Sequence, residues 1–246
     1  MLIEQTVEKM RSMKLSKMAT SLKDRLARPD HQSLSLSEFI GYLVDDEYQY
    51  RQNKKLECRL RQAKFKESQA CIEDIDYNPK RNLTKKIVLD LAQNTWLRSH
   101  QNLVLNGKTG AGKSYLAQAL GNHACKNGFT VLYTRCPTLF SILKVARADG
   151  TYLLKLKSIQ KMDLVILDDF GVTQIDEEKR QDLFEIIESR YKVRSTMVAT
   201  QLTNSHWHEY LGGGMVADSI CDRLLRPALK IDLKGDTKRP EGKTLT

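Results

Sequence analysis

Hydrophobic and polar positions follow two different periods along the chain. Up to about residue 75 the apolar residues recur at intervals of three or four, which is the period of amphipathic helices. A first run extends from Val7 to Leu26 and ends before Pro29. A second run follows Ser35 and Glu38, which have the spacing of a capping box. The pattern therefore predicts a helical N-terminal region.

From Arg81 onward, helical segments alternate with short apolar runs that are rich in β-branched residues. Such continuous runs are typical of strands buried on both faces of a parallel sheet. The predicted strands cover residues 102–107, 129–134, 163–169, 195–201 and 228–233. The predicted helices cover residues 83–93, 113–126, 137–148, 151–160, 177–192 and 215–225. We therefore predict an α/β domain with a five-stranded parallel sheet, preceded by a small all-helical domain.

The boundary between these two domains is predicted near residues 74–80. The helical period stops in the segment EDIDYNPKRN, which combines several acidic residues with the breaker Asn78-Pro79. We therefore expect the helical domain to comprise residues 1–76 and the α/β domain to comprise residues 77–246.

The composition excludes several classes of protein. Hydrophobic residues make up 41% of the 246 residues, with 13 Gly and 5 Pro, which argues against a disordered or collagen-like chain. The N-terminus is charged, and no apolar stretch approaches the roughly 18 residues that span a membrane. Five cysteines without a CxxC pair indicate reduced thiols rather than a disulfide framework. We expect a soluble cytoplasmic protein with no membrane partner.

A surplus of positive charge adds a candidate partner. The chain has 40 Lys and Arg against 30 Asp and Glu, a formal net charge of +10. The densest basic stretch, residues 51–66, holds seven Lys or Arg and one Glu. Such charge favours polyanions, because Lys and Arg release counterions from nucleic acid. A solvated helix face would have the same composition, so both interpretations of this stretch stay open.

The strongest motif is GxxxxGK[ST], which lies between a predicted strand and a predicted helix. Its glycines allow a compact loop whose backbone N–H groups converge on a nucleotide phosphate at the helix N-terminus. Lys113 is expected to contact the β- and γ-phosphates, and the Ser114 hydroxyl is expected to bind Mg²⁺. The residues expected to bind the nucleotide are Gly107, Lys108, Thr109, Gly110, Ala111, Gly112, Lys113 and Ser114.

Two other predicted strands end in polar residues. Asp168 and Asp169 follow four apolar residues, about 55 positions after the phosphate loop. Ligand chemistry lies at the carboxyl ends of parallel strands, so Asp168 is expected to hold Mg²⁺ and Asp169 to orient the attacking water. Gln201, which ends the fourth strand, is expected to touch the γ-phosphate or that water. With Lys113, these side chains form the predicted catalytic set.

Two features near the C-terminus are less specific. Arg223 lies in a predicted helix, and it is a candidate for a contact with the γ-phosphate of a neighbouring subunit. An ordinary surface arginine is the alternative. His206 and His208 flank Trp207 without a further ligand at metal spacing, so we interpret them as loop residues packed around Trp207.

The sequence resembles the IstB-like transposition helper ATPases, relatives of the helicase loader DnaC in the AAA+ class. The resemblance covers nearly the whole chain, including WLRSHQNLVLNGKTGAGKSYLAQALGNHACKNGFTVLY, LVILDDFG, ESRYKVRSTMVATQL and ADSICDRLLRPALKIDLKGD. It implies a bacterial, Mg²⁺-dependent and DNA-stimulated ATPase that assembles as an ATP-bound homo-oligomer on double-stranded DNA. Such a protein assists its partner transposase in target selection. The implied fold is a helical N-terminal domain, which contacts partners or DNA, followed by an AAA+ domain without a separate lid.

The resemblance also assigns residues. It implies that Asp168 is the magnesium acid and that Arg223 is the finger that acts in a neighbouring subunit. Two positions depart from the family pattern: Asp169 replaces the usual Glu, and Thr200-Gln201 replaces the usual Ser-Asn. A shorter acid beside a longer amide either preserves the distance to water or slows hydrolysis.

DNA contacts are expected on two basic segments. By resemblance, the helical region between the second and third strands faces DNA, which makes Lys144 and Arg147 candidates for phosphate contacts. The basic stretch of the N-terminal region adds Lys54, Lys55, Arg59 and Arg61. We see no base-reading motif, so binding should be independent of sequence and sensitive to salt.

Three alternative functions stay open at this point. The first is a loader that grips a replicative helicase instead of a transposase. The second is a small-molecule kinase, which the paired strand-end acids and the missing substrate lid disfavour. The third is a scaffold that uses ATP only as an assembly ligand.

Overall fold

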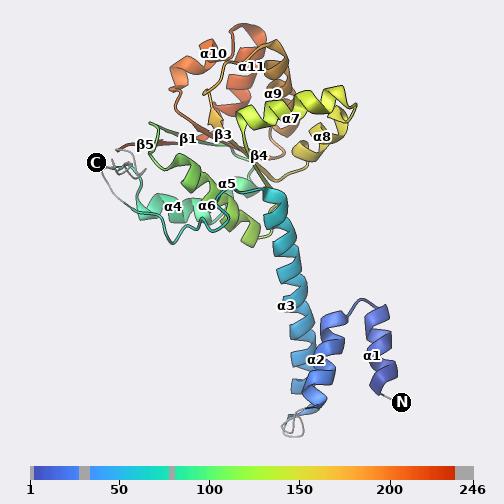
Figure 1. Ribbon diagram of the computed structural model, residues 1–246. Helices are drawn as coiled ribbons and strands as arrows, with labels where there is room; N and C mark the ends of the chain where they lie inside the picture. The colour runs from blue at the N-terminus through green and yellow to red at the C-terminus, as the bar shows by residue number, and fades with distance from the viewer. Residues whose placement is uncertain (1–2, 28–33, 78–80, 236–246) are drawn as a thin grey trace, which may run out of the picture. The chain divides into compact units, whose positions relative to one another are not determined.

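The computed structural model describes residues 3–27, 34–77 and 81–235 (Figure 1). Contacts divide the chain into two units, Met1–Cys58 and Arg59–Thr246, and the division lies within helix α3 (Leu36–Ala63). It lies earlier in the chain than residues 74–80, where the helical period of the sequence stops. The breakers Pro29 and Asn78-Pro79 fall outside the described residues.

The first unit contains α1 (Ile3–Ser12), α2 (Ser16–Leu26) and the first part of α3. The apolar run that begins at Val7 is divided between α1 and α2, because Lys14 adopts a left-handed φ of 60°. The Leu15 N–H donates to the Met10 carbonyl at 2.9 Å across this break, a bond that closes a helix end. Apolar residues from all three helices form a small core: Val7, Ala19, Leu22 and Leu43.

Two carboxylates organise the helix ends of this unit. The predicted capping box is confirmed, because the Ser35 N–H donates to Glu38 Oε2 at 2.9 Å and the Glu38 N–H donates to Ser35 Oγ at 3.3 Å. Glu47 Oε2 accepts from the N–H groups of Lys17 and Met18, both at 2.9 Å, at the start of α2. A side chain of α3 thereby satisfies backbone donors of another helix.

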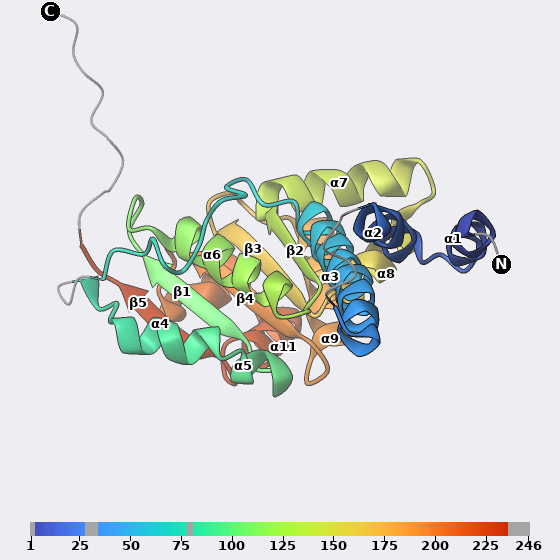
Figure 2. The ribbon, with the colours of Figure 1, turned by 90° about the horizontal axis from the view of Figure 1, so that it is seen from below.

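The second unit is built on a parallel five-stranded sheet with the strand order β2-β3-β4-β1-β5 (Figure 2). This confirms the predicted α/β class and the predicted number of strands. The strands are β1 (Leu103–Gly107), β2 (Val131–Arg135), β3 (Leu164–Phe170), β4 (Ser195–Thr200) and β5 (Leu229–Leu233).

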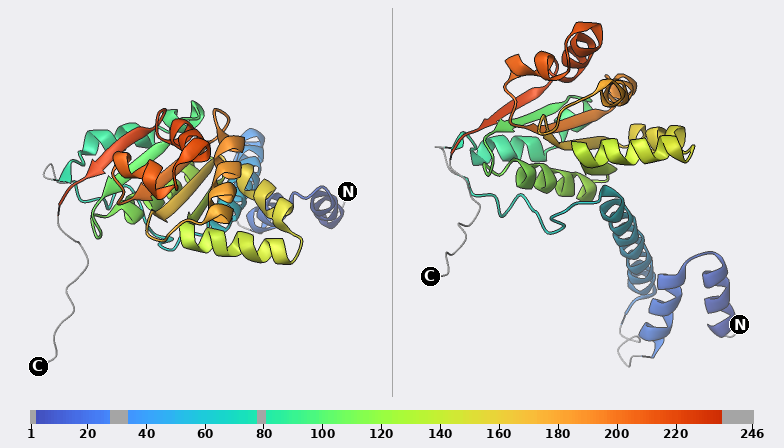
Figure 3. Two further views of the ribbon diagram at one scale, coloured as in Figure 1. Left: turned by 90° about the horizontal axis from the view of Figure 1, so that it is seen from above. Right: turned by 45° about the horizontal axis from the view of Figure 1, so that its top comes forward.

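Helices cover both faces of this sheet, with α4 and α6 on one face and α9 and α11 on the other (Figures 2 and 3). The predicted helix 177–192 ends two residues early, because Tyr191 leaves helical geometry with a ψ of 125°. The helical elements are α4 (Lys85–Ala92), α5 (Thr95–Arg98), α6 (Lys113–Lys126), α7 (Cys136–Ala148), α8 (Tyr152–Gln160), α9 (Glu177–Arg190), η3 (Asn204–His206), α10 (Trp207–Tyr210) and α11 (Gly214–Leu224).

The apolar runs are buried on both sides, as predicted for central parallel strands. Every residue from Leu164 to Leu167 in β3 is buried. Val165 and Leu167 pack in the cluster formed with α7, α8, α9 and α11, and this cluster also contains Val104 and Val198 from the neighbouring strands. Alternate residues face the opposite side, where a Cβ on Gly121 of α6 would lie 2.8 Å from Ile166 Cδ1.

The segment that follows α3 packs against the second unit. Asn122 Nδ2, in the middle of α6, donates to the carbonyls of Ser68 and Ala70 at 2.9 Å each. Gln118 Oε1 accepts from the Glu67 N–H at 2.8 Å. Both polar side chains are buried on α6, where they form hydrogen bonds with this segment. These bonds explain why the segment belongs to the second unit.

Trp207 is fully buried and stacks on Phe170, with ring centroids 4.4 Å apart. The prediction that His206 and His208 pack around it is wrong, because both histidines are exposed, on η3 and α10. Residues adjacent in a helix point in different directions, so the neighbours of a buried tryptophan face solvent. His208 Nε2 lies 3.1 Å from Asp218 Oδ1 instead.

Within the part of the chain that the structure describes, no helix is both long enough and apolar enough to cross a membrane.

We predict that Trp207→Ala lowers the free energy of unfolding by about 3–5 kcal/mol, because it empties a buried site of aromatic size. Urea denaturation monitored by circular dichroism would measure this change. The control is Met215→Ala, at an exposed position, which should change stability by less than about 0.5 kcal/mol. Equal stabilities of the two variants would contradict the packing role of Trp207.

Candidate functional site

The phosphate loop joins the end of β1 to the start of α6, where the sequence predicted it. Gly112 has a φ of 86°, a conformation that favours glycine, directly before the first residue of α6. Gly107 has a φ of 153°, and a Cβ there would lie 2.5 Å from the Leu233 carbonyl oxygen. The close approach of β5 and the tight turn into α6 therefore both require glycine.

The Lys113 side chain is folded into this loop and is only 8% exposed. Its Nζ donates to the carbonyl oxygens of Gly107 at 2.7 Å and Lys108 at 2.9 Å. Backbone carbonyls thus hold the ammonium group at the N-terminus of α6, where the helix dipole and free N–H groups favour an anion.

A cavity of about 660 Å³ connects the loop with the carboxyl edge of the sheet. This volume lies in the range of ordinary ligand sites. The cavity brings together the predicted nucleotide-binding and catalytic residues Thr109, Lys113, Ser114, Asp168, Asp169 and Gln201. It is also lined by residues that sequence reasoning missed: Tyr133, Arg135, Ile75, Asp76, Arg81 and Leu83.

Asp168 ends the apolar part of β3 and is 2% exposed. Its Oδ2 accepts a hydrogen bond from Tyr133 Oη at 2.7 Å, and its Oδ1 accepts from the Asp169 N–H at 2.9 Å. Burial, together with the hydrogen bond to Asp168, raises the pKa of Tyr133, which keeps its hydroxyl protonated as a donor. Tyr133 lies on the adjacent strand β2, and no motif in the sequence points to it.

Asp169 interrupts the regular strand. Its φ is 53°, and the register between β3 and β4 shifts between Leu167 and Phe170. Left-handed backbone at a residue other than glycine is uncommon and concentrates at functional sites. The Asp169 carboxylate forms an ion pair with Arg135 Nε at the end of β2, and this hydrogen bond raises the pKa of Arg135.

Gln201 follows β4, which lies between β3 and β1 in the sheet. Its Oε1 accepts a hydrogen bond from Thr109 Oγ1 of the phosphate loop at 2.9 Å. The amide is therefore in contact with the loop and lines the cavity that the two acids also line.

Ser114 and Asp168 offer the oxygen ligands that Mg²⁺ prefers, and both line the cavity. No group of three or more His, Cys, Asp or Glu side chains suited to a metal occurs among residues 3–27, 34–77 and 81–235. A nucleotide-bound Mg²⁺ needs only one or two protein ligands, because phosphates and water supply the others. The residues present therefore fit this ion.

Arg223 does not line the cavity of its own chain. It lies on α11, where its guanidinium forms an ion pair with Glu188 of α9 and Nη1 donates to the Ser219 carbonyl at 3.2 Å. A role for Arg223 in a neighbouring subunit stays a prediction.

The candidate DNA contacts differ in their surroundings. Lys144 and Arg147 on α7 are both exposed, but the Arg147 guanidinium pairs with the buried carboxylate of Asp182 and lies 3.9 Å from the Tyr152 ring centroid. The charge of Arg147 is thus neutralised within the protein. The candidates on α3 are Lys54, Lys55 and Arg61, which are exposed, and Arg59, which is half-buried.

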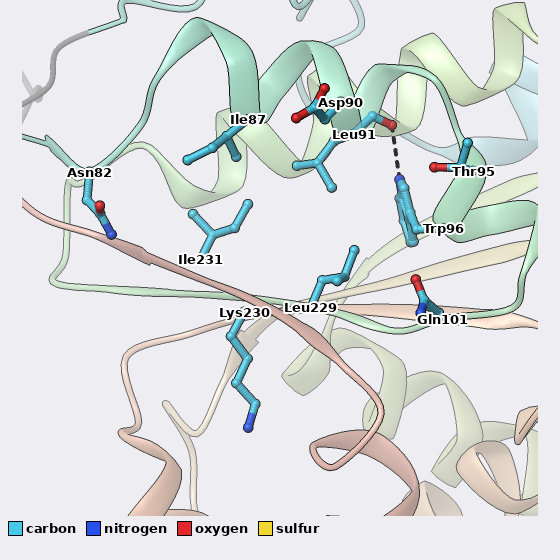
Figure 4. A pocket seen from close by; sticks show the side chains of 10 residues that line it. All are labelled: Asn82, Ile87, Asp90, Leu91, Thr95, Trp96, Gln101, Leu229, Lys230 and Ile231. Atoms are coloured by element: carbon cyan, nitrogen blue, oxygen red, sulfur yellow. Dashed lines mark hydrogen bonds between the residues drawn. The ribbon is translucent and has the colours of Figure 1, made fainter.

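A smaller hollow of about 330 Å³ lies between β5 and the helices α4 and α5 (Figure 4). Ile87, Leu91 and Ile231 point into it, and Trp96 Nε1 donates to the Leu91 carbonyl at 3.0 Å. None of the predicted site residues lines this hollow.

The family described as IstB-like ATP binding protein matches residues 8–246. The chain belongs to this family. It is 41% identical to an insertion sequence ATP-binding protein of Sinorhizobium fredii, over 97% of both chains. It is 38% identical to another from Pseudomonas fluorescens, over 83% of this chain and 89% of the relative. The expected resemblance is therefore confirmed, and ATP is the nucleotide that the family binds.

Solved structures support the same fold. The DnaC helicase loader superposes with a TM-score of 0.59 at 19% identity, over 67% of this chain and 97% of that chain. AMPPCP-bound DnaA from Aquifex aeolicus superposes with a TM-score of 0.58 at 22% identity, over 68% of this chain and 50% of that chain. At these identities the likeness concerns the fold alone.

We predict that Lys113→Ala weakens ATP binding about 100-fold, because it removes the charge that faces the phosphates. Isothermal titration calorimetry with ATP would measure the loss. Lys108→Ala is the matched control, since it removes the same charge from an exposed position of the same loop and keeps the backbone N–H. Equal affinities of both variants would contradict the role of Lys113.

Proposed function

We propose that the protein is a Mg²⁺-dependent ATPase that assembles as an ATP-bound oligomer on double-stranded DNA and assists a partner transposase of an insertion sequence. One observation carries the proposal. The phosphate loop shares a single cavity with Asp168, Asp169 and Gln201 in a chain of the IstB-like family. Loop and strand-end acids in one cavity are the arrangement that phosphoryl transfer to water requires.

The residues divide the chemistry among them. The loop N–H groups bind the phosphates, and Lys113 exchanges the carbonyls of Gly107 and Lys108 for phosphate oxygens. Ser114 and Asp168 would hold Mg²⁺, which when bound neutralises charge on the phosphates. Tyr133 orients Asp168 through its hydrogen bond.

Asp169 is the residue that would orient the attacking water, with Gln201 beside it. The Asp169 carboxylate is paired with Arg135, so it would exchange this partner for water before hydrolysis. The carboxylate is one methylene shorter than the usual Glu, and we propose that the protein hydrolyses ATP slowly for that reason.

DNA binding is proposed from charge and exposure. The net charge of +10 and the exposed side chains of Lys54, Lys55, Arg61 and Lys144 favour contacts with the phosphate backbone. Arg59 is a partly covered candidate, and Arg147 would first have to leave Asp182. Contacts of this kind would be independent of base sequence.

The oligomer and the partner are proposed from different observations. Arg223 lies outside the cavity of its own chain, which suits a group that acts in the site of a neighbouring subunit. The names of the relatives refer to insertion sequences, and insertion of a mobile element requires a transposase. We propose that the helical N-terminal domain, residues 1–76, contributes to these contacts. Such a function belongs in the bacterial cytoplasm.

Steady-state ATP hydrolysis with and without duplex DNA, measured beside light scattering of the same mixtures, tests the proposal. We expect large assemblies that need both ATP and DNA, with DNA-stimulated turnover. A protein that stays small and ignores duplex DNA would contradict the proposal and favour a helicase-loading role. ADP release that depends on a small hydroxyl acceptor would instead indicate a kinase.

We predict that Asp169→Asn keeps ATP affinity but slows hydrolysis about 100-fold or more, because the water loses its base. Assemblies on DNA should then persist after free ATP is removed. ADP release and the decay of light scattering measure the two effects. Asp218→Asn, at a position that does not line the cavity, is the control and should hydrolyse ATP normally. Rapid turnover by Asp169→Asn would show that another group orients the water.

We predict that Arg135→Gln raises DNA-free ATP hydrolysis several-fold, because Asp169 loses the partner that holds it. The DNA-stimulated rate should change little. Arg98→Gln on α5 removes the same charge at an exposed position and serves as the control. A decrease of the DNA-free rate would mean that Arg135 supports Asp169 in its active position.

A further inference from the structure

Arg81 reaches the phosphate loop from the segment before α4. It is only 8% exposed, and it lines the nucleotide cavity. Its Nη2 donates to the Ala111 carbonyl, and its Nη1 donates to the Asp76 carbonyl at 3.5 Å. A Cβ on Gly112 would lie 3.0 Å from Nη2, so the guanidinium lies directly beside the loop.

The backbone around Arg81 is anchored to β5 and the residues that follow it. The Lys234 N–H donates to the Arg81 carbonyl at 3.0 Å, and Asn82 Nδ2 donates to the Asp232 carbonyl at 3.1 Å. A Cβ on Gly235 would lie 3.2 Å from Arg81 Cγ. The position of the guanidinium is therefore built into the fold.

Within the part of the chain that the structure describes, the charge of Arg81 has no acidic partner. Among the described residues, no carboxylate lies within ion-pair distance of its guanidinium, although Asp74 and Asp76 line the same cavity. Buried arginines are normally paired, because carbonyl dipoles compensate a buried charge only in part. An anion in the cavity would supply the missing counter-charge.

Arg190 is the informative contrast. It is also buried, but it donates to the carbonyls of Ile159, Met162 and Ser195 and to Thr196 Oγ1. Arg190 lies in the core and is saturated by these acceptors. Arg81 has few acceptors and borders the nucleotide cavity, so a purely structural role accounts for Arg190 better than for Arg81.

We propose that Arg81 is a further phosphate-binding residue of the nucleotide site, an inference that rests on the ATP binding of the proposed function. Its guanidinium turns from the Ala111 carbonyl to phosphate oxygens, which it can contact through two N–H groups at once. Ala111 and Gly112 directly precede α6, whereas the cleavage chemistry is proposed for Asp168, Asp169 and Gln201. Arg81 therefore contacts phosphates shared by ATP and ADP and takes no part in cleavage.

The test compares Arg81→Gln and Arg81→Lys with the wild type in titration calorimetry with ATP, ADP and adenosine. We expect Arg81→Gln to bind ATP and ADP about tenfold more weakly and adenosine unchanged, since adenosine has no phosphate. Arg81→Lys should bind both nucleotides with intermediate affinity, because it keeps the charge and loses the fork. Arg98→Gln is the matched control.

Two results would overturn the proposal. One is unchanged affinity of Arg81→Gln for ATP and ADP, and the other is an equal loss for adenosine, which would mean a contact with the nucleoside or a structural role. If Arg81→Gln does not fold, Arg81→Lys decides: wild-type affinity for ADP overturns the proposal and a loss confined to the nucleotides supports it. Absence of ATP binding by the wild type would contradict the proposed function itself. If DNA does not stimulate ATP hydrolysis, the DNA-dependent part of the proposed function fails, but the binding role of Arg81 does not.

Discussion

All five strands run in the same direction, and this constraint brings the functional residues together. In a parallel sheet, the segments that follow the strands meet at the carboxyl edge. The loop after β1, the acids of β3 and Gln201 after β4 therefore line one cavity, although they are far apart in the sequence. The strand order sets the order of these three groups across the cavity, because β4 lies between β3 and β1.

The charged groups of the cavity already have partners within the protein. Lys113 bonds the carbonyls of Gly107 and Lys108, Arg81 bonds that of Ala111, and Asp169 pairs with Arg135. Nucleotide binding would therefore replace these bonds within the protein by bonds to the phosphates. Carbonyl dipoles are weaker partners for a cation than phosphate is, so the exchange favours the nucleotide. The ion pair between Asp169 and Arg135 is stronger than a hydrogen bond to a carbonyl. Release of the Asp169 carboxylate from Arg135 is therefore a separate step.

The segment between α3 and α4 takes part in both packing and binding. Its first half is bonded to Gln118 and Asn122 on α6, the helix that begins at the phosphate loop. Its second half supplies Asp76 and Arg81 to the wall of the cavity. The sequence shows only a loss of helical period here, because irregular backbone has no repeating pattern. Its role arises from hydrogen bonds to residues about 30 to 50 positions away.

The sequence by itself determined the parallel sheet, the phosphate loop, the capping box at Ser35 and the place of Asp168 at the end of a buried apolar run. These features are local: a hydrophobic period, a glycine spacing or a residue type at a strand end specifies each of them. Only the tertiary structure decided the partners of these residues, such as Tyr133 for Asp168 and Arg135 for Asp169. It also paired Arg147 with Asp182, 35 positions along the chain. Periodicity reports which face of an element is buried, whereas packing between distant elements decides which side chains meet.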